Sequence, residues 1–137
     1  MVRIEPKILK GFRDYLPELE GPRQRMLGLV KGAFERFGYG PLQTPALEYS
    51  EILVGKYGEE GDKLLYRFMD NGERDVALRY DLTVPLARVV GMYNDLVMPF
   101  RRYQVAPVWR AEKPAKGRFR EFMPVSYTHL TLPTSDL

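Results

Sequence analysis

Residues 100–122 read FRRYQVAPVWRAEKPAKGRFREF, and this stretch decides the fold. Apolar and polar side chains alternate over residues 101–110, which is the period-two pattern of a β-strand. A proline and a glycine within residues 112–117 predict a turn, after which residues 118–122 return as a second strand. The stretch therefore predicts an antiparallel hairpin, and it is strongly basic, with five arginines and two lysines against two glutamates.

A second hairpin is predicted upstream of the first. Two apolar runs, residues 64–69 and 75–79, flank the pair Asn71-Gly72. An Asn-Gly pair favours a two-residue type I′ turn, because both central residues of that turn need a positive φ. Two hairpins in one short chain predict an antiparallel sheet.

Helices are predicted before and after the second hairpin. Apolar residues recur at helical spacing over residues 22–37, with a proline in the first turn and Gly38 just past the end. A second apolar stripe at helical spacing, over residues 86–93, follows Asp81 and Thr83, either of which can cap a helix. Both helices would pack on the sheet.

The segments between these elements are less regular. Residues 41–47 are extended but contain Pro45, which places this strand at a sheet edge or an interface because proline donates no ladder hydrogen bond. Residues 48–63 are polar and glycine-rich, and they predict a loop with one helical turn near residues 51–54. The order of elements predicts an α+β fold, with helices packed on an antiparallel sheet.

The composition narrows the class of protein. The chain has 137 residues, 45% of them hydrophobic and 28% charged, which is typical of one globular domain. It contains no cysteine and a single histidine, His129, so we predict no disulfide and no metal site. No signal peptide and no membrane span is recognisable. We therefore expect a cytoplasmic protein.

The basic hairpin is the main candidate for chemistry. Arg118 and Arg120 project to the same side of a strand, and Arg110 and Glu112 share a face of the preceding one. Arginine guanidinium groups can bind phosphate oxygens with two hydrogen bonds, and the phenylalanine rings of the hairpin can stack on a flat base. These residues together therefore suit a nucleotide. The alternative is a surface hairpin whose arginines pair with its own glutamates, and spacing alone favours this alternative.

Residues 100–122 resemble motif 2 of the class II aminoacyl-tRNA synthetases. They are closest to the histidyl family, in which Arg-x-Glu precedes the pattern Pro-x-x-Gly-Arg-aromatic-Arg-x-Phe. Residues 78–88, LRYDLTVPLAR, resemble the signature of that family before motif 2, and residues 10–17, KGFRDYLP, resemble its N-terminal arm. The first helix with the following Thr44-Pro45 is similar to motif 1. The resemblance implies a fragment of the class II antiparallel sheet flanked by helices.

The resemblance implies a histidine–tRNA ligase, which activates L-histidine with ATP and transfers it to tRNA-His. Arg110 would be the catalytic residue, holding both the α-phosphate and the histidine carboxylate. Mg²⁺ would be bound through the phosphates. The implied ATP site consists of Arg110, Glu112, Arg118, Arg120 and Phe122, and the implied histidine site consists of Asp81, Thr83 and Arg110. The competing interpretation of Asp81 and Thr83 is a helix cap.

The resemblance also implies a partner subunit. In class II enzymes the motif 1 helix and its strand face a second copy of the chain. Part of the apolar stripe Met26, Val30 and Phe34, together with Pro45, would then line a homodimer interface. In isolation such a stripe is more often part of the core.

The end of the chain departs from the family pattern. Residues 1–123 match the N-terminal part of the catalytic domain, with motifs 1 and 2, whereas residues 124–137 do not match. A third motif and an anticodon-binding domain are missing, so we expect this fragment alone to be inactive. We hypothesise that residues 125–137 come from an out-of-frame or adapter-derived end. Two other functions stay open, the synthetase-like regulatory subunit of ATP phosphoribosyltransferase and a non-enzymatic basic RNA-binding module.

Overall fold

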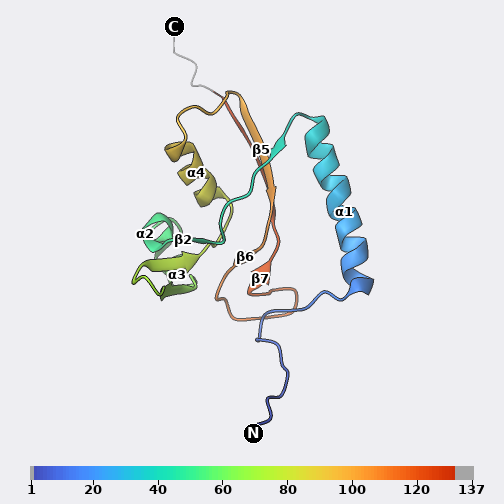
Figure 1. Cartoon of the computed structure of the whole chain (residues 1–137), viewed down its shortest axis with the longest axis vertical. Helices are drawn as coiled ribbons and strands as arrows, with labels where there is room; N and C mark the ends of the chain where they lie inside the picture. The colour runs from blue at the N-terminus through green and yellow to red at the C-terminus, as the bar shows by residue number, and fades with distance from the viewer. Residues whose placement is uncertain (1, 132–137) are drawn as a thin grey trace.

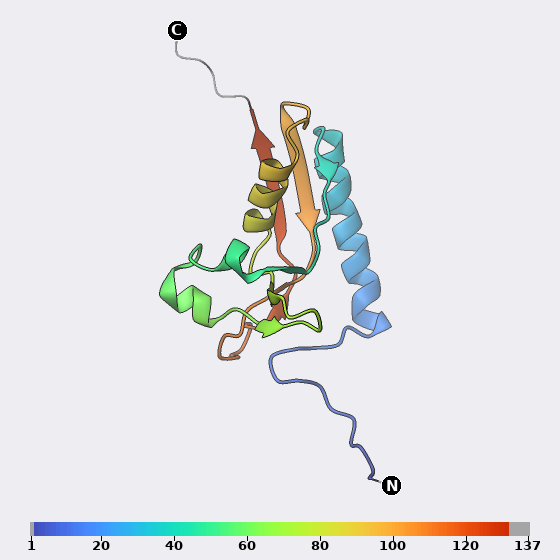
Figure 2. The same cartoon turned by 60° about the vertical axis from the view of Figure 1, so that its left-hand side comes forward.

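The computed structural model describes residues 2–131 and confirms the α+β class. Strands β5 (Phe100–Val105) and β8 (Val125–Leu130) run between helix α1 (Pro17–Arg36) on one side and helix α4 (Thr83–Met92) on the other, and the sheet built from residues 47–78 lies beside their lower end (Figures 1 and 2). In chain order the elements are α1 (Pro17–Arg36), β1 (Gly40–Pro41), β2 (Leu47–Tyr49), α2 (Ser50–Leu53), α3 (Gly58–Lys63), β3 (Arg67–Met69), β4 (Asp75–Leu78), α4 (Thr83–Met92), β5 (Phe100–Val105), β6 (Val108–Trp109), β7 (Glu121–Phe122) and β8 (Val125–Leu130).

The central sheet is built around β5. It pairs in parallel with β1 and antiparallel with β8, in a register that runs from Phe100 opposite Leu130 to Val105 opposite Val125. Tyr103 and Val105 point to one face, where they pack against Leu27 of α1. This face is the main core of the sheet, and it fixes the long helix alongside β5.

Helix α1 ends in a Schellman motif, as the position of Gly38 predicts. The N–H of Tyr39 donates to the carbonyl of Phe34 at 3.0 Å, and the N–H of Gly38 donates to the carbonyl of Glu35 at 3.1 Å. Gly38 has a φ of +83°, and the rings of Phe34 and Tyr39 pack 5.7 Å apart across the motif. The start of the helix was predicted too late, because Pro17 and not Pro22 occupies the first turn.

The upstream hairpin is confirmed, but its predicted turn type is wrong. Strand β4 pairs antiparallel with β3 on one edge and with β2 on the other. The positive φ falls on Glu73, at +61°, and not on Asn71 or Gly72. The carboxylate of Asp70 accepts hydrogen bonds from the N–H groups of Gly72 and Arg74, at 2.9 and 2.8 Å. This aspartate stabilises a longer, bulged loop in place of the two-residue type I′ turn.

The downstream hairpin is shorter than predicted. The strand expected over residues 101–110 is broken after Val105, because Pro107 has no N–H to donate to a ladder. Only β6 and β7 form the predicted pair, with Trp109 opposite Glu121. The antiparallel partner of β5 is β8, in a segment for which the sequence predicts no element. Residues 41–47 are likewise not one strand, and α3 occupies part of the predicted loop over residues 48–63.

A buried arginine joins the sheet of β2, β3 and β4 to strand β6. Arg79 follows β4, and its side chain is 3% exposed. Its Nε donates to the carbonyl of Pro107 and its Nη1 to the carbonyl of Thr44, both at 2.8 Å. Its own carbonyl accepts from the N–H of Trp109 at 3.1 Å. Arg79 therefore fixes the position of β6, and with it the residue that follows this strand.

Candidate functional site

Arg110 directly follows β6, and its guanidinium is held between two aromatic rings. Its Cζ lies 4.2 Å from the centre of the Tyr80 ring and 5.0 Å from the centre of the Phe122 ring. Its Nε donates to the carbonyl of Tyr80 at 3.1 Å, and its N–H donates to the carbonyl of Arg120 at 2.9 Å. Within residues 2–131, no hydrogen bond is found for the two terminal guanidinium nitrogens. The hydrogen bond from Nε orients the guanidinium, and its two terminal nitrogens are left to bind a ligand.

A cavity of about 440 Å³ opens beside this guanidinium. It brings together four of the five residues that the resemblance assigns to ATP. Three arginines against one glutamate make it electropositive, which suits a polyphosphate. The cavity is lined by Arg13, Arg110, Glu112, Gly117, Arg118, Phe119 and Phe122.

The loop on one side of the cavity is a tight turn. Ala115 and Arg118 exchange backbone hydrogen bonds at 3.2 and 2.9 Å, and Gly117 supplies a φ of +74°. Arg118 extends from this turn with 66% of its side chain exposed, and its Nε lies 4.0 Å from Glu112. A pair this exposed and this long is weak, so Arg118 is available to an anion.

Arg120 is not part of the cavity lining. Its Nε donates to the carbonyl of Glu112 at 2.9 Å, and its Nη1 donates to the carbonyl of Lys10 at 3.2 Å. Its N–H donates to the carbonyl of Gly11 at 2.7 Å. Arg120 therefore ties the loop of the hairpin to the N-terminal arm, whereas the resemblance assigns it to the ATP site.

Asp81 serves the start of helix α4. Its Oδ1 accepts a hydrogen bond from the N–H of Val84 at 3.2 Å and another from the hydroxyl of Tyr57 at 2.8 Å. Burial raises the pKa of Tyr57, and the bond to Asp81 raises it further, so the hydroxyl keeps its proton and donates. Thr83 is the first residue of α4 and is exposed. Asp81 therefore caps the first turn through Val84 from one residue before the N-cap position, which Leu82 occupies, whereas Thr83 lies inside the helix and is not its cap.

Tyr80 connects Asp81 to Arg110. Its ring lies 4.5 Å from the ring of Tyr57, which holds Asp81, while Arg110 covers it at 4.2 Å. A fixed cation and a fixed carboxylate are thereby joined through one aromatic pair. Such an arrangement can hold a ligand that carries both an anionic and a cationic group.

Three residues of this site are not among the site residues that the sequence predicts, although Tyr80 and Arg13 lie in the stretches 78–88 and 10–17 that carry the resemblance. Tyr57 and Tyr80 sit in a predicted loop and at the end of a predicted strand. Arg13 comes from the N-terminal arm, and its Cζ lies 4.1 Å from the ring centre of Phe119. Only the approach of the arm to the hairpin, which is a tertiary contact, brings Arg13 to the cavity.

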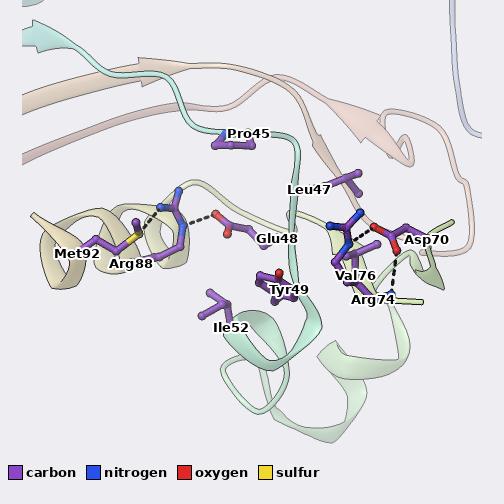
Figure 3. Close-up of a pocket in the computed structure, with 10 residues that line it drawn as sticks. All are labelled: Pro45, Leu47, Glu48, Tyr49, Ile52, Asp70, Arg74, Val76, Arg88 and Met92. Carbon is purple, nitrogen blue, oxygen red and sulfur yellow. Dashed lines mark hydrogen bonds and ion pairs between the residues drawn. The ribbon is translucent and has the colours of Figure 1, made fainter. Parts of the chain in front are cut away.

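Another cavity, of about 580 Å³, lies between β2 and α4. Figure 3 shows Glu48 and Arg88 pointing toward one another across it, with Pro45 and Tyr49 nearby. Arg88 donates to Glu48 at 2.8 Å, and Glu48 is 7% exposed.

Over residues 2–131 no group of three potential metal ligands occurs. In the same range, no helix has both the length and the apolar character that crossing a bilayer requires.

Comparisons with known proteins agree on one family. A family model described as histidyl-tRNA synthetase matches residues 11–127. The chain is 52% identical over 121 residues to a histidine–tRNA ligase of Rhodopirellula baltica, which covers 88% of this chain and 27% of that protein. A histidine–tRNA ligase of Treponema denticola is 51% identical over 128 residues, which are 93% of this chain and 29% of the relative.

Solved structures are similar as well. The crystal structure of histidyl-tRNA synthetase from Nostoc superposes with a TM-score of 0.77 at 33% identity, covering 88% of this chain and 28% of that one. A protein of Bacillus halodurans, described as an ATP phosphoribosyltransferase regulatory subunit/histidyl-tRNA synthetase, also gives 0.77 at 27% identity, covering 91% and 33%. The chain thus spans 27–29% of the length of these curated relatives.

Proposed function

The chain belongs to the histidyl-tRNA synthetase family, and we propose that it is the part of a histidine–tRNA ligase that binds ATP and histidine for adenylate formation. The observation that carries the proposal is Arg110, which lines the basic cavity, is held between Tyr80 and Phe122, and donates to the described chain through its Nε and not through its two terminal nitrogens. Membership of the family suggests the class of reaction, and the geometry around Arg110 supports the position of the proposed ATP and histidine site.

Arg110 suits the proposed reaction because that reaction needs no general base. The histidine carboxylate, already ionised at neutral pH, attacks the α-phosphorus of ATP. A new carboxyl oxygen–phosphorus bond forms, and the bond between the α-phosphorus and the pyrophosphate oxygen breaks. The protein must align two anions and stabilise the charge that builds on the phosphoryl group. One planar fork can contact both anions, which a lysine cannot do in the same geometry.

The other residues of the cavity fit the remaining parts of ATP. Phe122 offers a ring on which the adenine can stack, and the carboxylate of Glu112 can accept a hydrogen bond from the amino group of the adenine. Arg118, a largely exposed residue of the lining, would contact the outer phosphates. Mg²⁺ would be held by the phosphate oxygens, since the described residues hold no ligand cluster of their own. Arg120 would act by positioning the loop.

Histidine is assigned to the other side of Tyr80. Asp81 is oriented by its hydrogen bonds to Tyr57 and Val84, and its carboxylate can receive the α-ammonium group beside the hydroxyl of Tyr57. Thr83, exposed at the start of α4, would be a second acceptor. The histidine carboxylate would then extend toward Arg110. On this proposal the capping role and the binding role of Asp81 coexist, because a carboxylate has more than one acceptor position.

The proposal includes partners beyond the small substrates. We place the protein in the cytoplasm, with tRNA-His as the acceptor, and we assign the homodimer interface to the face around Pro45. That face has exposed apolar side chains, among them Leu47 at 42%, Tyr49 at 53% and Met92 at 59%. From the apolar stripe of α1, Phe34 packs in the core, whereas Met26 is 57% exposed.

The test is histidine-dependent ATP–pyrophosphate exchange by the full-length gene product. Arg110→Ala is expected to lower kcat by about 10²–10³-fold, the usual loss of one charge-stabilising donor. The matched control is Arg25→Ala, an exposed arginine on α1, which should leave the rate unchanged. Exchange that survives in Arg110→Ala would contradict the assignment. Histidine binding without exchange would favour a regulatory subunit, and salt-sensitive RNA binding without ATP affinity an RNA-binding module.

A further inference from the structure

A second guanidinium in the basic cavity is held in much the same way as that of Arg110. Arg13, from the N-terminal arm, contacts two rings, with its Cζ 4.1 Å from the ring centre of Phe119 and 4.6 Å from that of Tyr15. Its Nε donates to the hydroxyl of Tyr15 at 2.6 Å. Within residues 2–131 this is the one hydrogen bond found for its guanidinium. The two terminal nitrogens of Arg13, like those of Arg110, are therefore left to bind a ligand.

The segment that carries Arg13 is anchored to the body of the protein. On one side, Arg120 donates to two main-chain carbonyls of residues 10–11, at 2.7 and 3.2 Å. On the other side, the Cζ of Arg23 in α1 lies 4.3 Å from the centre of the Tyr15 ring. Contacts before and after Arg13 in the chain thus fix its main chain beside the cavity. A guanidinium that is oriented in advance loses less conformational entropy when it binds an anion.

Arg13 and Arg110 contact different ends of one short segment. Arg110 contacts the ring of Phe122, and Arg13 contacts the ring of Phe119. Phe119 is the direct chain neighbour of Arg118, with Cα atoms about 3.8 Å apart. All five side chains line the same cavity. Arg13 therefore belongs with Arg118, which is assigned to the outer phosphates, and not with Arg110, which is assigned to the α-phosphate.

We propose that Arg13 is a further ATP-binding residue, whose terminal guanidinium nitrogens contact the β- or γ-phosphate from the side of the N-terminal arm. This inference deepens the proposed function and rests on it. When the bond between the α-phosphorus and the bridging oxygen breaks, pyrophosphate leaves with the electron pair and gains negative charge. A cation held beside the outer phosphates stabilises that charge. Tyr15 is a positioning residue, because its hydroxyl directs the Nε of Arg13.

Equilibrium binding of ATP and of AMP to the full-length gene product tests this contact. AMP keeps the adenine, the ribose and the α-phosphate but lacks the two outer phosphates. Arg13→Ala is expected to weaken ATP binding by about tenfold, the usual effect of one lost charged hydrogen bond, and to leave AMP binding within about twofold. Arg13→Lys keeps the charge without the planar guanidinium and should lose part of the ATP affinity. Unchanged AMP binding also shows that the cavity has folded.

Arg23→Ala is the matched control. Arg23 contacts the same Tyr15 ring but is not among the residues that line the cavity, so its substitution should leave the affinities for both nucleotides unchanged. Tyr15→Phe keeps the ring and removes the hydroxyl that accepts from the Nε of Arg13. It should weaken ATP binding less than Arg13→Ala does, again without a change for AMP. An equal loss of ATP affinity in Arg23→Ala and Arg13→Ala would overturn the inference.

Three further results would overturn it. Equal losses for ATP and AMP in Arg13→Ala would mean that Arg13 only holds the arm in place. No loss for either nucleotide, or a loss confined to transfer to tRNA, would place Arg13 outside the ATP site.

Exchange by the unsubstituted protein separates this inference from the proposed function. If histidine-dependent exchange is present and Arg13→Ala binds ATP normally, the inference fails and the proposed function stands. If exchange is absent but ATP binding still depends on Arg13, the phosphate contact stands and the ligase assignment fails.

Discussion

The side chain of Arg110 covers the ring of Tyr80 at 4.2 Å while its Nε donates to the carbonyl of the same residue. One residue therefore orients the guanidinium twice, through its main chain and through its ring. The carbonyl fixes the direction of the fork, and the ring limits its tilt. Because the two contacts come from different parts of Tyr80, a substitution can remove one and keep the other.

Tyr80→Leu keeps the carbonyl and removes the ring. If the ring serves to preorganise Arg110, kcat for histidine-dependent ATP–pyrophosphate exchange should fall by about tenfold in the full-length protein, with a smaller change in the KM for ATP. Phe68→Leu, an aromatic residue of the exposed hairpin, is the control. Equal rates for the two variants would show that the carbonyl alone positions Arg110.

Arg118 and Arg120 are two residues apart, but their substitution by alanine should have different effects on stability and on ATP binding. Arg120→Ala removes two charged hydrogen bonds to main-chain carbonyls, so we expect a loss of about 1–3 kcal/mol in the free energy of unfolding. Arg118→Ala removes an exposed side chain and should change stability by less than about 0.5 kcal/mol. Urea denaturation of the 137-residue chain measures both. In the full-length protein Arg118→Ala should mainly raise the KM for ATP.

The contrast between these two arginines shows what the sequence can and cannot predict. Alternation along a strand puts both on one side, and the family motif assigns both to ATP. The structure separates them, because Arg120 is drawn to carbonyls of Lys10 and Glu112, and Lys10 is 110 residues away in the chain. No local pattern encodes such a contact.

The fold was predictable to the same degree. Helix α1 and its Gly38 terminus follow from spacing and from one glycine, both of which are local signals. The pairing of β5 with β8, the role of Arg79 between the sheets and the αL conformation of Glu73 were not predictable. Each depends on which distant segments meet, and Pro107 broke a strand whose alternation continued across it.

Gly11 should tolerate no side chain. It has a φ of +88°, and a Cβ at this position would lie 2.8 Å from two carbons of the Arg120 side chain. Gly11→Ala should therefore destabilise the chain by about 1 kcal/mol or more in urea denaturation. Gly28→Ala is the opposite control, since Gly28 lies within α1 with nothing near its Cβ, and it should stabilise by up to about 1 kcal/mol. A neutral Gly11→Ala would mean that the arm is not held by Arg120.

Stability should fall in acid through Asp75. Hydrogen bonds from Arg67, and then from Ser50, lower the pKa of Asp75 to about 2. A folded-state pKa below the ordinary value of 3.8 means that the contribution is complete above pH 3.8 and is lost as the pH falls toward 2. In Asp75→Asn, the midpoint of unfolding should depend less on pH between these two values. Glu73→Gln, on the neighbouring loop, is the control and should leave the acid dependence in place.

Asp81→Asn separates the cap from the proposed substrate contact. Asparagine can still accept hydrogen bonds from the N–H of Val84 and the hydroxyl of Tyr57, so the free energy of unfolding should change by less than about 1 kcal/mol. The negative charge that would receive the α-ammonium group of histidine is lost, so the KM for histidine in exchange should rise by about 10–100-fold, with the KM for ATP nearly unchanged. Tyr57→Phe, which removes only the neutral donor, should shift the KM for histidine much less. If the KM for histidine is unchanged in Asp81→Asn, Asp81 only caps the helix and does not bind the substrate.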